Sequence, residues 1–153
     1  MRAYTYSVVV DRSPEDVWSF LTDLSAGPRW RASMRSMEVV GGGPLVAGAE
    51  VRVVIEALGK VSERTIRTTV FDPPRRWVTT SASNGMSGEF GYAVEPSGAG
   101  SRVTATCDLH AHRFLAWVFL PLVARQERRW RSGQMASFKR ACEAAVAAGG
   151  SVK

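Results

Sequence analysis

Residues 89–111, EFGYAVEPSGAGSRVTATCDLHA, contain two runs in which apolar and polar side chains alternate, joined by the short segment 97–101. Successive side chains of a β-strand point to opposite faces of a sheet, so the alternation predicts two strands that are each apolar on one side. The short, Ser- and Gly-rich connection is typical of a hairpin, so the two strands are expected to pair antiparallel. The pattern therefore predicts an antiparallel sheet with one dry face and one wet face.

The same alternation extends upstream over residues 50–82, where turn signals at residues 58–60 and at Pro73-Pro74 separate the strands. Asn84-Gly85 is a strong hairpin signal, because both residues accept the positive φ angles of a type I′ turn. The strand that follows Pro74 is ambiguous, since apolar side chains occur on both of its faces. We predict that Trp77 faces inward.

Two short helices are expected between the first strand and this meander. Tyr4–Val10 is rich in β-branched and aromatic residues and is the predicted first strand. Ser13 is a favourable N-cap, and Pro14 is a favourable first residue, for the helix that follows. A second short helix or loop around Trp30 leads to a strand at Met37–Val40.

A long helix is expected to close the chain from about Leu115. Large side chains recur every three or four residues, at Leu120, Val123, Arg131, Met135, Phe138 and Cys142. Pro121 is expected to bend or start this helix, because an interior proline removes a backbone hydrogen bond. The sequence therefore predicts one domain over residues 1–148 and a flexible tail at residues 149–153.

Composition places the chain among globular proteins with one sizeable core. It has 153 residues, of which 45% are hydrophobic and 22% are charged. The longest apolar run, Phe114–Ala124, is shorter than the roughly 18 to 20 residues that cross a bilayer. The N-terminus lacks the apolar region of a secretory signal. Cys107 and Cys142 have no metal-site spacing and are predicted to be reduced and buried, which favours a cytoplasmic location.

Five local motifs occur in order along the chain. They are Val8–Asp11 followed by Ser13–Trp18, Asp23 with Pro28 and Trp30, Phe71–Trp77, Gly100–Thr104, and Phe138–Arg140 with Glu143. Together they resemble the START-like (SRPBCC, helix-grip) superfamily, in particular its bacterial polyketide cyclase/dehydrase branch, over about residues 2–147. The resemblance implies an α+β helix-grip fold of the START/Bet v 1 type, in which a curved antiparallel sheet of about seven strands wraps around a long C-terminal helix.

The resemblance also implies that the protein binds or transports a hydrophobic small molecule, lipid- or polyketide-like, in an internal cavity. One helix does not fill the concave face of so large a sheet, so inward residues are expected to line a cavity as well as a core. The predicted ligand-binding residues are Trp30, Met34, Val53, Arg64, Ile66, Thr68, Trp77, Phe90, Tyr92, Val103, Ala105, Cys107, Trp117, Met135 and Phe138.

Shared architecture does not choose among functions, so two alternatives stay open. One is an enzyme of the polyketide cyclase/dehydrase type that acts on a poly-β-ketone-like substrate. The other is a protein-interaction module that uses the basic C-terminal helix. Monomer and homodimer are both compatible with the sequence.

Arg64 and Tyr92 are the candidate catalytic residues, because alternation places both polar side chains on the inner face. A buried guanidinium and phenol can hold a carboxylate, phosphate or enolate, and an enzyme would use them to polarise a carbonyl or donate a proton. The alternative interpretation places Arg64 at a strand end, where it reaches solvent. His110 and His112 fall on the outer face, so no metal site is predicted, and no nucleotide motif or other cofactor signal is found in the sequence.

The net charge of +6 favours anionic partners. The apolar segment Phe114–Leu122 is followed by several arginines, and it is interpreted either as core and lid packing or as a peripheral contact with an anionic membrane. Nucleic acid is not the predicted partner, because the arginines are scattered from Arg2 to Arg140 and stacking platforms need several exposed aromatic residues.

Overall fold

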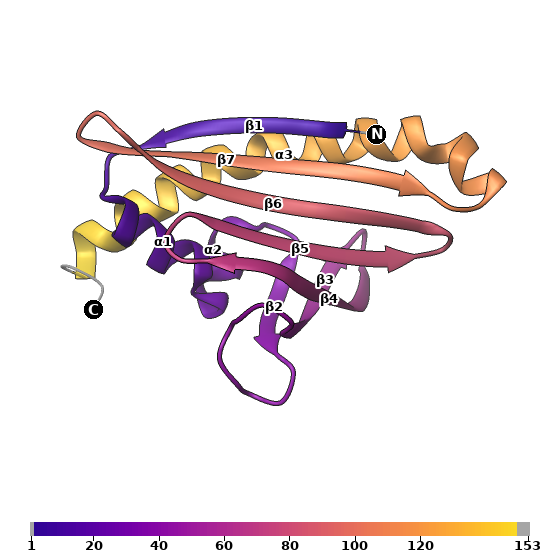
Figure 1. Cartoon of the computed structure of the whole chain (residues 1–153), viewed down its shortest axis with the longest axis horizontal. Coiled ribbons are helices and arrows are strands. Elements are labelled where there is room, and N and C mark those ends of the chain that lie inside the picture. The colour runs from indigo at the N-terminus through magenta and orange to yellow at the C-terminus, as the bar shows by residue number, and fades with distance from the viewer. Residues whose placement is uncertain (1, 150–153) are drawn as a thin grey trace.

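One antiparallel sheet of seven strands is the framework of the computed structural model, which describes residues 2–149 (Figure 1). Its strands are β1 (Arg2–Val10), β2 (Met34–Val39), β3 (Glu50–Ala57), β4 (Lys60–Asp72), β5 (Arg76–Ser83), β6 (Met86–Ser97) and β7 (Gly100–Ala111). Their order across the sheet is β1-β7-β6-β5-β4-β3-β2. All neighbours except β1 and β7 are therefore consecutive in sequence, and the predicted antiparallel meander is confirmed.

Short helices link β1 to β2, as the sequence predicted. They are α1 (Pro14–Thr22), the 3₁₀ turn η1 (Leu24–Ala26) and α2 (Gly27–Trp30). The Ser13 hydroxyl accepts a hydrogen bond from the backbone N–H of Asp16 at 3.2 Å, which satisfies one of the free donors at the start of α1. The apolar side of α1, including Val17 and Leu21, is buried under the sheet.

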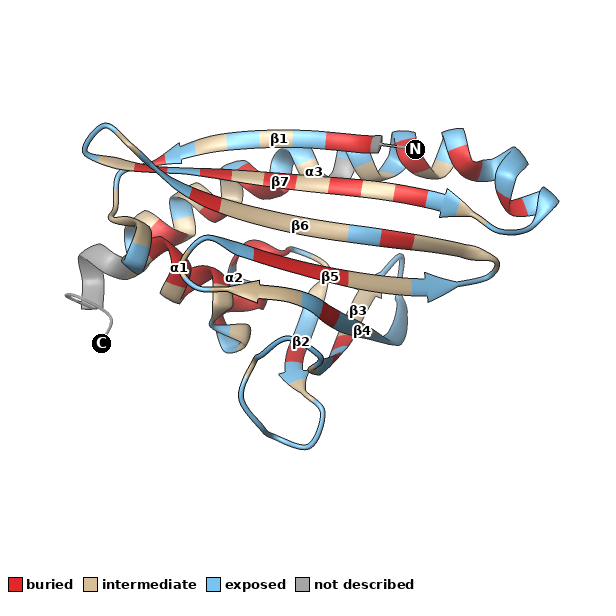
Figure 2. Cartoon of the chain, in the orientation of Figure 1, coloured by how far each residue is buried: buried red, intermediate tan, exposed pale blue. Residues whose placement is uncertain are grey.

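The predicted division into inner and outer faces is confirmed for most of the sheet (Figure 2). Val51, Val53 and Val103 are buried. Their neighbours along the strands, Arg52 and Arg102, are exposed. Trp77 is 1% exposed, and its indole N–H donates a hydrogen bond to the hydroxyl of Thr68 at 3.3 Å. The ambiguous strand therefore turns its Trp77 side inward, as predicted.

An irregularity in β4 reverses the alternation after Thr68. The register with β5 shifts between Thr68 and Val70, so that Val70 lies opposite Val78 and Phe71 lies opposite Trp77. Strict alternation would place Val70 on the face of Thr68, but an extra residue in one strand moves the following side chains to the other side. Phe71 takes the inner position and lies 5.5 Å, ring to ring, from Trp18.

The β5–β6 turn is the one that the sequence predicted. Asn84 and Gly85 have φ angles of 52° and 76°, and positive values at both positions are required by a type I′ turn. The backbone N–H of His112 donates a hydrogen bond to the carbonyl of Gly85 at 2.7 Å. The turn is thereby joined to the segment that precedes the long helix.

The long helix α3 (Phe114–Gly149) runs along the side of the sheet formed by β1 and β7 (Figure 1). Arg128 donates a hydrogen bond to the carbonyl of Ala3 at 3.0 Å, and its own carbonyl accepts one from the hydroxyl of Tyr6 at 3.0 Å. Further along α3, the Glu143 carboxylate accepts a hydrogen bond from the backbone N–H of Asp11 at 3.0 Å. Polar contacts at two separate points therefore fasten the helix to the edge strand.

The helix begins at Phe114, close to the expected start near Leu115, and Pro121 lies inside it rather than at its start. Its end differs from the prediction, because the helix continues to Gly149, which was expected to begin the tail. The remainder of the predicted tail, residues 150–153, lies outside the described residues. No described helix has the length and hydropathy needed to span a membrane.

The core lies between the C-terminal half of α3 and the strands. Phe138 is fully buried, and its ring lies 4.8 Å from that of Trp30 and 5.6 Å from that of Phe20. Both cysteines are free and buried, as predicted. Burial raises the pKa of the Cys107 thiol to about 12 and that of Cys142 to about 11, so neither is a thiolate at neutral pH.

Candidate functional site

A hollow lies between the inner face of β3–β6 and the middle of α3. Its total empty volume, which includes open solvent at the mouth, is about 750 Å³, and the part that admits the centre of a water-sized sphere is about 90 Å³. The larger figure includes open solvent, so the space enclosed by protein atoms is smaller than 750 Å³. The hollow therefore accepts a slim or partly inserted molecule without rearrangement.

The walls are mainly apolar and come from consecutive strands. Cross-strand pairs bring their inward side chains together, because Trp77 lies opposite Tyr92 and Thr79 lies opposite Phe90. Apolar lining side chains are supplied by Met34, Met37, Val53, Ile55, Ile66, Trp77 and Phe90. Such a surface favours an apolar guest, since each Å² of apolar area removed from water contributes about 25 cal/mol.

The floor of the hollow holds a buried arginine. Arg31 follows α2 directly and is 5% exposed, with its Cζ 3.8 Å from the centre of the Trp30 ring. One terminal nitrogen donates a hydrogen bond to the hydroxyl of Tyr92 at 3.3 Å, and the other contacts the sulfur of Met37 at 3.4 Å. Among the described residues no carboxylate forms a salt bridge with Arg31. Its charge is balanced by a phenol, a ring face and thioethers, all of which are weak substitutes for an anion.

Tyr92 is positioned between two guanidinium groups. Burial by itself would raise the pKa of this phenol, but the charges of Arg31 and Arg131 outweigh burial and hold its pKa below the usual value. Burial also lowers the pKa of Arg31, and the neighbouring Tyr92 opposes this change. An arginine nevertheless stays protonated at neutral pH, so the environment of Tyr92 is positively charged.

A second arginine enters from α3. Arg131 lies 3.5 Å from a carboxylate oxygen of Glu127 and donates a hydrogen bond to the side-chain oxygen of Gln134 at 2.7 Å. Its Cζ is 5.4 Å from the centre of the Phe90 ring. Together with Arg31 and the exposed Arg64, it gives the lining three arginines against one glutamate. The interior therefore has an excess of positive charge and suits an anionic or strongly polarised oxygen.

Seven of the fifteen residues predicted from sequence line the hollow. They are Met34, Val53, Arg64, Ile66, Trp77, Phe90 and Tyr92. Arg64 is exposed at the mouth rather than buried. Of the two alternatives for this residue, the one in which it reaches solvent is therefore correct. Tyr92 alone of the two candidate catalytic residues therefore lies deep in the site.

The other eight predicted residues lie outside the lining. Seven of them are buried in the surrounding core, namely Trp30, Thr68, Val103, Ala105, Cys107, Met135 and Phe138. Trp30 and Thr68 support the site indirectly, because they contact Arg31 and Trp77 respectively. Trp117 is 64% exposed and lies on the outer side of the first turns of α3, so its placement in the pocket was wrong. Those turns extend along the sheet edge and do not cover the hollow.

The remaining lining residues were missed by the sequence prediction. They are Arg31, Ser33, Met37, Ile55, Thr79, Ser81, Glu127, Arg131 and Gln134. Alternation does place Ile55 and Thr79 on the inner face, and Arg131 recurs four residues before Met135 on the buried side of α3. These signals were available. Arg31 lies at a corner between α2 and β2, where no periodicity indicates which way a side chain points.

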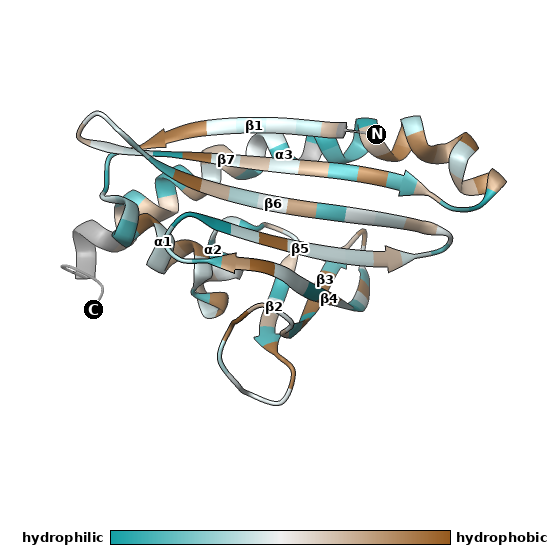
Figure 3. Cartoon of the chain, viewed as in Figure 1, coloured by the Kyte–Doolittle hydropathy of each residue, from teal (hydrophilic) through white to brown (hydrophobic). Residues whose placement is uncertain are grey.

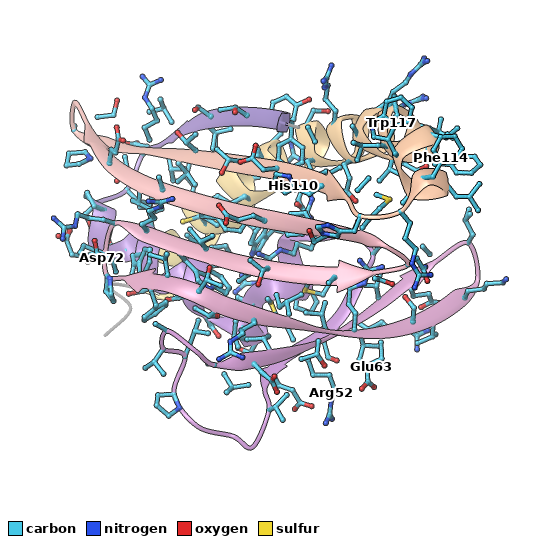
Figure 4. All side chains as sticks on the ribbon, turned by 45° about the vertical axis from the view of Figure 1, so that its right-hand side comes forward. Arg52, Glu63, Asp72, His110, Phe114 and Trp117 are labelled. Carbon is cyan, nitrogen blue, oxygen red and sulfur yellow. The ribbon has the colours of Figure 1, made fainter. Side chains whose placement is uncertain are left out.

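A second hollow lies beside the loop Gly41–Gly43 and is lined partly by Glu38 and Arg52. About 380 Å³ of it admits the centre of a water-sized sphere. Arg52 forms exposed salt bridges with Glu38 and Glu63, and Figure 4 shows Arg52 and Glu63 on the outer side of the sheet. This wider hollow lacks the enclosed apolar walls and buried charge of the first. The first is therefore the candidate site.

The sequence profile described as "Polyketide cyclase / dehydrase and lipid transport" matches residues 1–143. The chain belongs to this family. Membership confirms the START-like resemblance, and the family description is consistent with binding of a hydrophobic small molecule in a cavity. The search of curated proteins found no significant match.

Solved structures with the same fold are similar over most of the chain. TTHA0849 from Thermus thermophilus is 20% identical, with a TM-score of 0.73 over 92% of this chain and 97% of that one. A START superfamily protein from Mycobacterium smegmatis is 16% identical, with a TM-score of 0.67 over 95% and 97%. The di-domain ARO/CYC BexL from the BE-7585A biosynthetic pathway is 16% identical, with a TM-score of 0.73 over 95% of this chain and 47% of that one. At these identities the comparison shows a shared helix-grip fold and says nothing about shared chemistry.

The contact between Arg31 and Tyr92 predicts a coupled effect on stability. Tyr92→Phe removes the oxygen that accepts a hydrogen bond from a buried guanidinium, and the free energy of unfolding should fall by about 1–3 kcal/mol. The double variant Arg31→Met with Tyr92→Phe should be more stable than the sum of the two single changes, because it leaves no buried charge without a partner.

Urea denaturation of the four proteins in this cycle measures the coupling. Tyr6→Phe is the matched comparison, and it should cost less than Tyr92→Phe, since the hydrogen bond of the Tyr6 hydroxyl is made to an exposed carbonyl that water can reach. Additive single changes, or a Tyr92→Phe protein as stable as the parent, would show that the contact has no energetic role.

Proposed function

We propose that the protein binds and carries an apolar small molecule, lipid- or polyketide-like, that has an anionic or strongly polarised oxygen at one end. The observation that best supports this proposal is the hollow, which has apolar walls from β3–β6 and the Arg31–Tyr92 pair at its floor. Family membership supports a ligand of this class. We further propose that the protein works in the cytoplasm, where two buried thiols remain reduced.

The energies indicate why the polar floor is needed. Burial of roughly 300 Å² of apolar ligand surface contributes about 7 kcal/mol, while association itself costs at least about 4 kcal/mol in lost freedom of motion. Apolar contact alone therefore supports only weak binding. A hydrogen bond to a charged group adds about 1.5–3 kcal/mol, which raises affinity by roughly tenfold or more. Arg31 is positioned to supply that bond and to select ligands that carry an acceptor.

Two fluorescent dyes of similar shape and different charge test this function. Anilinonaphthalene sulfonate is apolar with one anionic group, and phenylnaphthylamine is its neutral counterpart. Arg31→Met should weaken binding of the sulfonate by about tenfold or more and leave the neutral dye within about twofold. Fluorescence titration measures both affinities.

Arg52→Met is the matched control, because Arg52 lies on the outer face of β3 and is absent from the lining of the candidate site. It should leave both dyes unaffected. Equal losses for Arg31→Met and Arg52→Met, or an unchanged sulfonate affinity in Arg31→Met, would contradict the proposal.

A second candidate function, supported by the environment of Tyr92, is catalysis of cyclisation or dehydration on a poly-β-ketone-like substrate. A phenol whose pKa is lowered by two guanidinium charges is a better proton donor than free tyrosine. The same charges would stabilise an enolate, and Glu127, the carboxylate of the lining, would accept the proton that leaves the carbon next to the carbonyl. Arg31 and Arg131 would hold the substrate oxygen, and Tyr92 would donate the proton.

Turnover of a short poly-β-ketone thioester distinguishes catalysis from binding. If the protein is an enzyme, Tyr92→Phe should lower kcat by about 100-fold or more, because general acid catalysis contributes about that much. Its affinity for the neutral dye should stay within about twofold. Absence of turnover in the parent protein, or an unchanged kcat in Tyr92→Phe, would reject the enzyme candidate and leave binding as the function.

A further inference from the structure

Large apolar side chains cover the outside of the first turns of α3. In the segment Phe114–Leu122, here called the docking segment, Phe114 is 75% exposed, Trp117 is 64% exposed and Leu122 is 62% exposed. Leu115, Val118 and Phe119 are each at least half exposed as well. Figure 3 shows this end of α3 as a hydrophobic stretch, and Figure 4 shows Phe114 and Trp117 at the outside of the molecule.

The docking segment contacts its own protein through a narrow strip. Ala116 and Leu120 are buried, and the next residue of that strip is Ala124. Their four-residue spacing gives one narrow line along the helix, so the remaining surface of these turns faces outward. An exposed apolar surface of several adjacent large side chains is uncommon on a monomeric protein and marks a contact with something apolar.

The charges beside the docking segment identify that contact. Residues 112–126 include no Asp or Glu, and the exposed Arg113 and Arg125 lie at the two ends of the apolar turns, with the exposed Arg129 one turn further on. Arginine next to exposed Trp, Phe and Leu is the combination that binds an anionic lipid surface, where apolar side chains enter the acyl region and guanidinium groups meet phosphates. A second copy of this chain would bring arginines against arginines, which repel.

The position of the docking segment links it to the hollow. Along the inner side of β5, exposure rises from Trp77 at 1% through Thr79 at 6% to the half-buried Ser81, so the hollow opens toward the β5–β6 turn. That turn is hydrogen-bonded at 2.7 Å, through the carbonyl of Gly85 and the N–H of His112, to the segment just before α3. A surface bound to the docking segment therefore lies at the open end of the hollow.

We propose that the docking segment inserts into the surface of an anionic lipid bilayer and holds the mouth of the hollow at the membrane. The docking surface exists whether or not the hollow binds the ligand proposed above. An apolar molecule that dissolves in lipid would then pass between bilayer and hollow over a short path.

Co-sedimentation with lipid vesicles tests the proposal. The full chain should bind vesicles of equal parts phosphatidylglycerol and phosphatidylcholine more tightly than vesicles of phosphatidylcholine alone, and added salt should weaken the binding. The double variant Phe114→Ser with Trp117→Ser should lose at least about tenfold in affinity for the anionic vesicles. Arg125→Gln should lose about fivefold.

Two controls distinguish insertion from attraction by the overall charge. Val46→Ser changes a 47% exposed apolar residue outside the docking segment, and Arg102→Gln removes an exposed arginine from the outer face of β7; both should bind as the parent does. Leu122→Ser provides an independent single change in the docking segment. All variants should keep the dye affinity of the parent, which separates a failure of docking from a failure of ligand binding.

Three results would overturn the proposal. Equal vesicle binding by the parent and by the docking-segment variants would assign the attraction to net charge alone. Equal binding to neutral and anionic vesicles would remove the role of the arginines. A parent protein that ignores both vesicles and sediments as a dimer, while the double variant sediments as a monomer, would show that a second copy covers the segment.

Discussion

Attachment of α3 to the edge of the sheet is the constraint on which the rest of the structure depends. Arg128 is hydrogen-bonded to Ala3 and Tyr6 of β1, and Glu143 to Asp11 just after it. Between these two attachment points, Met135, Phe138 and Cys142 of α3 are buried in the core. A helix held along β1 and β7 cannot also cover the inner face of β3–β6. The hollow is therefore a consequence of where the helix is fastened. Its walls are inward strand residues that the helix leaves uncovered, and Glu127, Arg131 and Gln134 of α3 line the side opposite them.

The charge at the floor of this hollow is costly to fold and valuable for binding. Burying a guanidinium without a carboxylate is unfavourable, and Arg31 obtains only a phenol, a ring face and two sulfurs as compensation. A guest with an anionic oxygen would complete that environment. The same arrangement lowers the pKa of the Tyr92 phenol, so the proposed binding and the proposed proton transfer would use the same pair of residues. Family membership is compatible with both uses.

Periodicity predicted much of the fold and part of the site. Two-residue alternation correctly placed Val53 and Val103 inside, because a strand allows each side chain only two directions. Trp77, on the strand where alternation was ambiguous, faces inward as predicted. It did not predict the bulge after Thr68, whose cause lies in pairing with β5 rather than in local sequence. Arg31 was missed because a corner between helix and strand has no period. Trp117 was misplaced because an apolar side chain near a pocket in sequence need not face it, and its turn of α3 faces solvent.

The central claim is that an apolar guest enters the space between β3–β6 and α3. Methyl NMR spectra of the methionine side chains test it most directly, since Met34 and Met37, both on β2, line that space. Titration with an apolar anion should shift both signals in parallel with its binding curve. Saturation of the protein with the anion while both signals stay unchanged would place the guest elsewhere and contradict the account.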